Sequence, residues 1–146
     1  MESLQGMKCE QPLGSGPSRA PMSRRILLAD DDPASLEGLR SLLVAWGYEV
    51  ETAEDGRAAL DKVGAVHPSV VITDVVMPAM SGLELLDAVK RKEPAIPVIV
   101  MTGHGTLETR RRATAQGAFA YLPKPVDTAR LRSVLTKAFH KTRSLS

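Results

Sequence analysis

Aromatic residues are scarce in this sequence, at 3% of its 146 residues, although 43% are hydrophobic. The core of a domain of this size must therefore be built from Leu, Val, Ile, Ala and Met. Cysteine is nearly absent as well, and a single residue of this type, Cys9, excludes an intrachain disulfide. A chain without disulfides suits a reducing compartment, so we expect a cytoplasmic protein.

Long apolar runs are also missing. No run approaches the roughly 18 residues of a membrane span, and the N-terminus lacks the apolar segment of a signal peptide. We therefore expect no membrane partner. The N-terminal segment is instead rich in Gly, Pro and Ser and shows no apolar periodicity. This composition predicts a disordered tail over residues 1–24 and one folded domain over residues 25–146.

The net charge of +2 conceals a strong asymmetry between the two halves of the chain. Residues 26–89 carry 12 acidic and 3 basic side chains, whereas residues 90–146 carry 12 basic and 3 acidic ones. The two halves therefore have formal charges of −9 and +9. Either these are ordinary solvated helix faces, or the first half holds a cation and the second half presents a basic partner surface.

From residue 25 onward, short apolar runs alternate with segments whose apolar residues recur at helical spacing. The runs predict strands at residues 26–30, 48–53, 70–74, 98–102 and 120–122. The intervening segments predict helices at residues 33–46, 55–63, 82–91 and 106–116, and a last helix after residue 127. Pro33 is placed to start the first helix, Gly64 and Gly117 to follow the second and fourth, and Asp127 to cap the last.

Strands that alternate with helices imply parallel pairing, right-handed crossovers and helices on both faces of one sheet. The runs of Val and Ile agree, because central parallel strands are buried on both sides. The sequence thus predicts an α/β fold, a doubly wound five-stranded parallel sheet with five helices.

Polar residues that can carry chemistry fall at the carboxyl ends of these strands, the edge where open α/β sheets bind ligands. Asp30 and Asp31 end the first run, Asp74 ends the third, Thr102 ends the fourth, and Lys124 follows the fifth. Three clustered carboxylates cannot all stay ionised without a compensating charge. Oxygen ligands with no His or Cys nearby favour a hard cation such as Mg²⁺.

A carboxylate beside a metal ion and a lysine is suited to attack phosphorus, and aspartyl phosphates are a known class of covalent intermediate. The metal and Lys124 would stabilise charge on the transferred oxygens, which is most of what phosphoryl transfer requires. Thr102 offers a hydroxyl donor to the same group. We therefore interpret the edge as a site of phosphoryl transfer.

Four segments at these strand ends resemble the receiver domains of bacterial two-component response regulators. They are Leu27-Leu28-Ala29-Asp30-Asp31-Asp32-Pro33, Val71-Ile72-Thr73-Asp74-Val75-Val76-Met77-Pro78-Ala79-Met80-Ser81-Gly82, Val100-Met101-Thr102-Gly103-His104-Gly105 and Gly117-Ala118-Phe119-Ala120-Tyr121-Leu122-Pro123-Lys124-Pro125. The resemblance covers residues 25 to about 141, and both the order and the spacing of the segments agree.

The resemblance implies the flavodoxin-like strand order 2-1-3-4-5 and a role for each residue of the site. Asp74 would be the phosphoacceptor, and Asp30 and Asp31 the acidic pair that helps hold Mg²⁺. Asp31 and the Val76 carbonyl would be direct ligands of the ion, and Asp74 would belong to the same metal site. Thr102 and Lys124 would contact the phosphoryl oxygens, and Tyr121 would follow the movement of Thr102. The Lys124–Pro125 peptide would be cis.

By the same resemblance, the chain is a phosphoacceptor switch that takes a phosphoryl group from a sensor histidine kinase or a histidine phosphotransfer protein. It would catalyse its own phosphotransfer and dephosphorylation only, and would not be an enzyme acting on a separate substrate. It would signal through protein contacts to an unknown downstream partner. It is either a stand-alone receiver or the receiver of a longer regulator.

Three features depart from the family's usual pattern. Ser81 occupies a turn position that is most often Asp, where we expect little effect. Val76 and His104 stand at the mouth of the site, at positions that tune the phosphoryl lifetime. The helix after Thr102 carries Arg110, Arg111 and Arg112. Counted from Leu107, its inner face is predicted to include position 110 or 111 and position 114.

We therefore expect that helix to be the least tightly packed of the five, with its arginine heads in water. We also expect it to be mobile and to form the basic part of an output surface with Tyr121 and the last helix.

Two other functions use related residues. A phosphatase with an aspartate nucleophile usually has a second acid two residues later. In this chain that position is Val76 if Asp74 is the nucleophile, or Asp32 if Asp30 is the nucleophile. A flavin-binding module needs a phosphate loop after the first strand, where the run of acids from Asp30 to Asp32 would repel a phosphate. DNA binding by the basic half has no motif behind it and is not expected from this chain.

Overall fold

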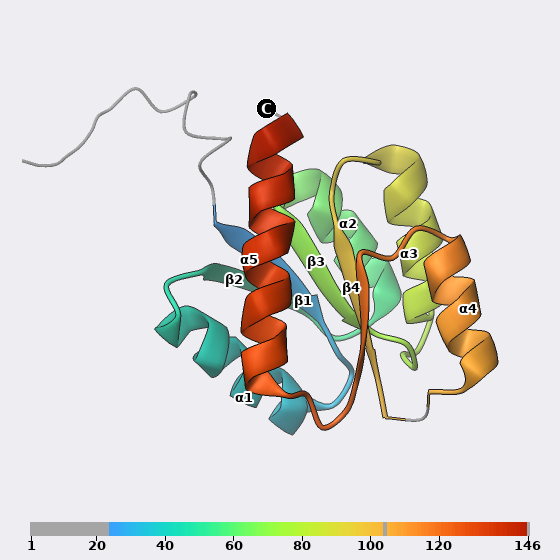
Figure 1. Cartoon of the computed structure of the whole chain (residues 1–146). Helices are drawn as coiled ribbons and strands as arrows, with labels where there is room; N and C mark the ends of the chain where they lie inside the picture. The colour runs from blue at the N-terminus through green and yellow to red at the C-terminus, as the bar shows by residue number, and fades with distance from the viewer. Residues whose placement is uncertain (1–23, 104, 146) are drawn as a thin grey trace, which may run out of the picture.

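Each predicted apolar run forms a strand of a single sheet in the computed structural model, which describes residues 24–103 and 105–145 (Figure 1). The Gly-, Pro- and Ser-rich tail up to residue 23, with Cys9, and His104 lie outside the described residues. The five strands are β1 (Arg25–Ala29), β2 (Glu49–Ala53), β3 (Val70–Asp74), β4 (Val98–Thr102) and β5 (Ala120–Pro123). They pair in parallel in the order β2-β1-β3-β4-β5, which confirms the predicted topology.

Five helices connect and follow the strands, as predicted. They are α1 (Pro33–Ala45), α2 (Gly56–Val66), α3 (Gly82–Lys92), α4 (Leu107–Ala115) and α5 (Thr128–Leu145). None of the helices within the described ranges combines the length and apolar composition needed to cross a membrane.

The alternation of side chains along the strands divides the core into two layers. Ile26 and Leu28 of β1 face the layer formed with α1 and α5, whereas Leu27 and Ala29 face the layer formed with α2, α3 and α4. Figure 1 shows α5 crossing in front of the sheet. The largest fully buried side chains are all Leu, Ile or Met, so the prediction of an aliphatic core is confirmed.

Several of the few aromatic residues lie where α5 packs against the rest of the domain, and Tyr48 belongs to the core. Phe139 of α5 stacks on Tyr48, with ring centroids 5.0 Å apart, and the Arg24 guanidinium lies 4.5 Å from the Tyr48 ring. Arg132 of α5 covers Trp46 at 5.2 Å. These stacking and cation–π contacts add to the aliphatic contacts of α5 and hold it against the sheet.

Capping side chains mark the start of four of the five helices, whereas Asp32 at the start of α1 makes no capping hydrogen bond with its side chain. Asp55, Ser81 and Thr106 cap α2, α3 and α4 with side-chain hydrogen bonds. The Asp127 carboxylate accepts from the backbone N–H groups of Ala129 and Arg130 at the start of α5.

Ser81, the departure from Asp noted in the sequence, forms a capping box. Its hydroxyl accepts from the Glu84 N–H at 3.2 Å, and its own N–H donates to the Glu84 carboxylate at 2.9 Å. Two N–H groups at the start of α3 are thereby satisfied.

The end of α2 differs from the prediction. The predicted helix stops at Val63, but the helix continues through Gly64 to Val66 and ends at His67, which adopts a left-handed conformation with φ 48°. Pro68 then prevents continuation. The Arg25 guanidinium donates to the Val66 carbonyl at 2.8 Å, a long-range cap that local sequence rules do not reveal.

The inner face predicted for α4 is wrong. Leu107, Arg110, Arg111 and Thr114 are all exposed, and Ala113 is the one buried residue of this helix. The segment has too few apolar residues to define its orientation, so the helix turns its alanine inward and leaves Leu107 64% exposed. The arginines lie in water without needing to extend across an apolar surface.

We expect the amides of α4 to exchange faster with deuterium than those of α1, because α4 buries one small side chain whereas α1 buries Leu36 and Leu43. Hydrogen exchange read by mass spectrometry on peptides covering residues 34–46 and 107–115 compares the two helices within one sample. Slower exchange in α4 would contradict a loosely packed helix.

Ala79, in the loop between β3 and α3, adopts φ 69°, a left-handed conformation that costs an L-residue about 1–2 kcal/mol. Glycine removes this cost but makes the unfolded chain more flexible. We expect Ala79→Gly to raise the free energy of unfolding by about 0.5–1 kcal/mol in urea denaturation.

The control is the same substitution at the exposed Ala65 of α2, where glycine should lower stability by about 0.5–1 kcal/mol. Effects of the same sign at the two positions would show that backbone conformation does not decide the outcome.

Candidate functional site

Three acidic side chains meet at the carboxyl edge of the sheet. Asp30 directly follows β1 and Asp74 is the last residue of β3, and β1 and β3 are neighbours in the sheet. Carboxylate oxygens of Asp30, Asp31 and Asp74 lie within 4.8 Å of one another. Asp30 and Asp74 are buried, with 2% and 8% of their surfaces exposed, whereas Asp31 faces solvent. The acidic cluster predicted from the sequence is therefore present.

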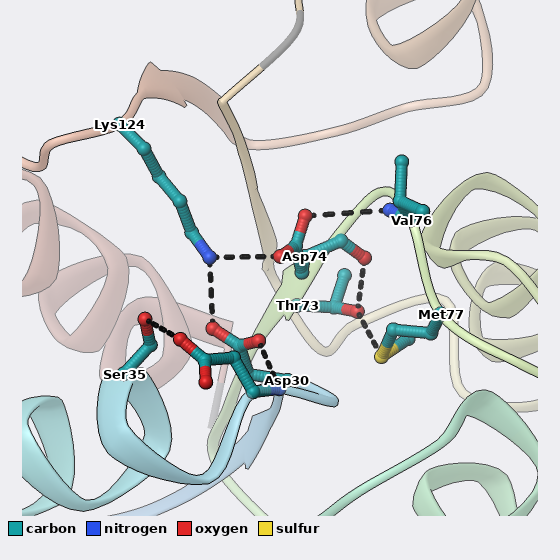
Figure 2. Close-up of polar contacts among 8 residues, drawn as sticks. Asp30, Ser35, Thr73, Asp74, Val76, Met77 and Lys124 are labelled. Atoms are coloured by element: carbon teal, nitrogen blue, oxygen red, sulfur yellow. Dashed lines mark hydrogen bonds and ion pairs between the residues drawn. The ribbon is translucent and has the colours of Figure 1, made fainter.

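Lys124 supplies the compensating charge. Its ammonium lies 2.8 Å from Asp30 Oδ2 and 2.8 Å from Asp74 Oδ2, and Figure 2 shows it reaching from the far side of the site to both carboxylates. Burial on its own lowers the pKa of Lys124, but hydrogen bonds and attraction from Asp30 and Asp74 outweigh it and raise this pKa above its ordinary value. Lys124 is therefore held in its charged form.

Backbone groups orient the two buried carboxylates. Asp30 Oδ1 accepts from the Asp32 N–H at 3.0 Å, and Asp74 Oδ1 accepts from the Val76 N–H at 3.3 Å. Each of these carboxylates thus has one oxygen on a backbone N–H and the other on Lys124 (Figure 2). The Thr73 hydroxyl donates to the Asp74 carbonyl at 2.9 Å and holds the end of β3 in place.

Gly82 brings α3 close to Asp74. A Cβ atom at this position would overlap the Asp74 backbone carbonyl, and the Gly82 N–H donates to the Val75 carbonyl at 2.8 Å. The loop that follows Asp74 therefore folds tightly back on the strand, which explains the need for glycine after Ser81.

Thr102 and Tyr121 share a pocket of about 500 Å³ with Lys124. Thr102 ends β4 and is 3% exposed. The Tyr121 hydroxyl has no hydrogen-bond partner among the described residues, and burial raises its pKa, with Arg110 acting in the opposite direction.

The three arginines of α4 differ in their surroundings. All three are exposed, but only Arg110 lines the pocket beside Tyr121. The Val76 side chain is 62% exposed at the mouth of the site. His104 lies outside the described residues.

Two residues beside the site were missed by the sequence reasoning. Gly105 packs so closely on Tyr121 that a Cβ atom would overlap the hydroxyl, and Arg130 of α5 lines the same pocket as Arg110. Gly105 could have been noticed in the sequence as a second glycine two residues after Gly103. Arg130 had no such signal, because only the fold brings residues of α4 and α5 to the same pocket.

We expect Gly105→Ala to displace the Tyr121 ring, because the new methyl group would overlap both its hydroxyl and the Thr102 methyl group. The chain has two tyrosines, so fluorotyrosine labelling gives two resonances for ¹⁹F NMR, with Tyr48 as the internal reference. The Tyr121 signal should shift and the Tyr48 signal should not.

Gly38→Ala is the matched control, because a Cβ atom there meets open space. An unchanged Tyr121 signal in Gly105→Ala would show that the two residues are not packed together.

Comparisons with known proteins agree with the geometry. Residues 26–136 match the family model of the response regulator receiver domain. The transcriptional regulatory protein ZraR of Escherichia coli K12 is 41% identical over 120 residues, which cover 82% of this chain and 27% of that protein. The nitrogen assimilation regulatory protein NtrX of Azorhizobium caulinodans is 34% identical and is likewise covered over 27% of its length.

The chain thus spans about a quarter of the length of these curated relatives. Solved receiver structures are covered almost completely. A response regulator receiver domain protein from Clostridium thermocellum is 35% identical with a TM-score of 0.80, over 84% of this chain and 98% of that one. A CheY-like receiver domain protein from Methanospirillum hungatei is 31% identical with a TM-score of 0.81, over 85% of this chain and 99% of that one. The chain belongs to the receiver domains of two-component response regulators, a family of phosphoacceptor switches.

Proposed function

We propose that residues 25–146 form a receiver whose phosphoacceptor is Asp74. The supporting observation is the contact of the buried Asp74 carboxylate with Lys124 at 2.8 Å, beside two further carboxylates within 4.8 Å. An Asp74 oxygen attacks the phosphorus of a phosphohistidine, the N–P bond breaks, and the imidazole leaves with the electron pair. The product is an aspartyl phosphate.

The acidic cluster suits Mg²⁺, because its donors are carboxylate oxygens held within reach of one ion. We propose that Asp30, Asp31 and Asp74 hold the ion together with the Val76 carbonyl. When bound, Mg²⁺ neutralises charge on the carboxylates and on the transferred oxygens.

Lys124 and Thr102 are proposed to hold the phosphoryl group from the other side. Lys124 is already charged and already in contact with the acceptor, so it can neutralise a phosphoryl oxygen without long movement. The Thr102 hydroxyl is the second donor. Because Tyr121 lines the same pocket as these two residues, a shift of Thr102 or Lys124 changes the space around the ring.

The donor is proposed to be a sensor histidine kinase or a histidine phosphotransfer protein in the cytoplasm, where kinases find ATP. The chain supplies its own catalytic groups, and loss of the phosphoryl group occurs by autodephosphorylation, with no separate substrate. The output surface is proposed to comprise Tyr121, the arginines 110–112 of α4 and helix α5. Residues 1–24 are proposed to be a tail outside the receiver.

Incubation with acetyl phosphate and Mg²⁺ should add one phosphoryl group to the wild-type chain, read by intact mass. Asp74→Asn should remain unmodified, because an amide has no nucleophilic carboxylate, and removal of Mg²⁺ with EDTA should suppress the adduct. Asp61→Asn, at an exposed position of α2, is the matched control and should be modified like the wild type.

A wild-type chain that never gains the adduct with any small phosphodonor and cation, or an Asp74→Asn chain that gains it, would exclude this function.

A further inference from the structure

Another pocket, of about 530 Å³, is lined by α1 and by the segment that joins β5 to α5. Leu39 of α1, Met101 of β4, Pro125 and Val126 form its apolar walls. Met101 is fully buried, and Leu39 and Val126 pack against the core layer formed with α1 and α5. A concave, mostly apolar site of this size suits a small molecule.

Gly38 leaves one wall of this pocket open. It lies in the interior of α1, where glycine is less favourable than alanine. Its φ is not in the left-handed region, and a Cβ atom there would meet no atom of the described chain within 4 Å. Neither backbone conformation nor close packing therefore requires glycine at this position. The space left by the missing side chain belongs to the pocket.

Three polar residues, Asp30, Ser35 and Lys124, also line the pocket. The Lys124 ammonium is already engaged, because it contacts the carboxylates of Asp30 and Asp74 at 2.8 Å each. The Ser35 hydroxyl donates to Asp32 Oδ2 at 2.8 Å, and the lone pairs of its oxygen can still accept a hydrogen bond. The polar part of the pocket thus offers acceptors to a ligand.

Carboxylates outnumber cationic groups around these polar residues. Asp31 and Asp74 lie in one cluster with Asp30, and Asp32 contacts Ser35. Four carboxylates therefore face the single ammonium of the lining, and one divalent ion in the cluster would still leave a negative charge in excess. This field favours a ligand with a positive charge over a neutral or anionic ligand.

We propose that this pocket binds a small organic molecule with an apolar body and a protonated amine. The body packs between Leu39 and Val126 beside Gly38, and the amine donates to the Ser35 hydroxyl and to Asp30. This site goes beyond the proposed phosphoacceptor function, because its ligand is a small molecule and its binding requires no phosphoryl group on Asp74.

A neutral apolar side chain, from a partner protein or from a second copy of this chain, could use the same walls. Such a side chain would fill the space beside Gly38 but would leave the Ser35 oxygen and the excess negative charge without a partner. Charge complementarity therefore favours the amine.

The test is a titration of the ¹⁵N-labelled full chain in EDTA with three naphthalene probes of similar size, followed by heteronuclear NMR. The probes are 1-naphthylmethylamine, 1-naphthylmethanol and 1-naphthoate. The amine should shift the amide signals of Gly38, Leu39 and Val126 with a dissociation constant on the order of 1 mM, an ordinary affinity for about twelve non-hydrogen atoms. It should bind at least fivefold more tightly than either of the other probes.

Gly38→Leu fills the open space and should raise the dissociation constant of the amine at least tenfold. Leucine is the better helix former, so this variant should keep its fold. Gly64→Leu, the same substitution at an exposed position inside α2, is the matched control and should bind the amine as the wild type does.

The proposal is overturned if the amine shifts none of the three amide signals, if 1-naphthoate binds as tightly, or if Gly38→Leu and Gly64→Leu have equal affinities. Equal binding of 1-naphthylmethanol and the amine would instead assign the pocket to a neutral side chain of a partner. A wild-type dimer that Gly38→Leu dissociates in sedimentation would assign it to a second copy. Because the titration contains no phosphodonor, its outcome is independent of the acetyl phosphate assay.

Discussion

The contact of one ammonium group with two buried carboxylates is the interaction on which the site depends. Asp30 and Asp74 are almost fully removed from water, and two such charges side by side need compensation. Lys124 provides it at 2.8 Å from each carboxylate. The same contact joins β1, β3 and the end of β5, because each of the three side chains comes from the end of a different strand. The contacts that balance the buried charges therefore also hold the ends of these three strands together.

The parallel sheet explains why the polar side chains of the site lie together at this edge. Both faces of the sheet are covered by aliphatic layers, so polar side chains that belong to strands find water at the strand ends. Parallel strands bring all their carboxyl ends to the same edge, and this places Thr102 and Lys124 beside the acids. Lys124, which contacts Asp74, also lines the Tyr121 pocket together with Thr102, so the acidic cluster and this pocket share a side chain.

Helix α4 shows where the sequence was not sufficient to predict which face of a helix is buried. In α1 and α3 several large apolar residues recur on one face, and Leu36, Leu43 and Leu86 are buried there. In α4 the only large apolar residue is Leu107, and it lies in solvent. A single small residue, Ala113, decides which face turns inward, and such a weak signal appears only when the sheet and α3 are in place. The end of α2 was missed for a related reason, since Arg25 reaches it from β1.

By itself, the sequence determined the alternation of strands and helices, the parallel sheet, the aliphatic core and the residues of the acidic cluster, because apolar period, strand-end position and motif spacing are local properties. Tertiary structure alone decided that Lys124 bridges Asp30 and Asp74, that Gly105 packs on Tyr121, and that Arg130 joins Arg110 beside it. These relations join residues that are far apart in the chain or depend on side-chain placement. Their distances follow from strand order and helix orientation, which no local pattern encodes.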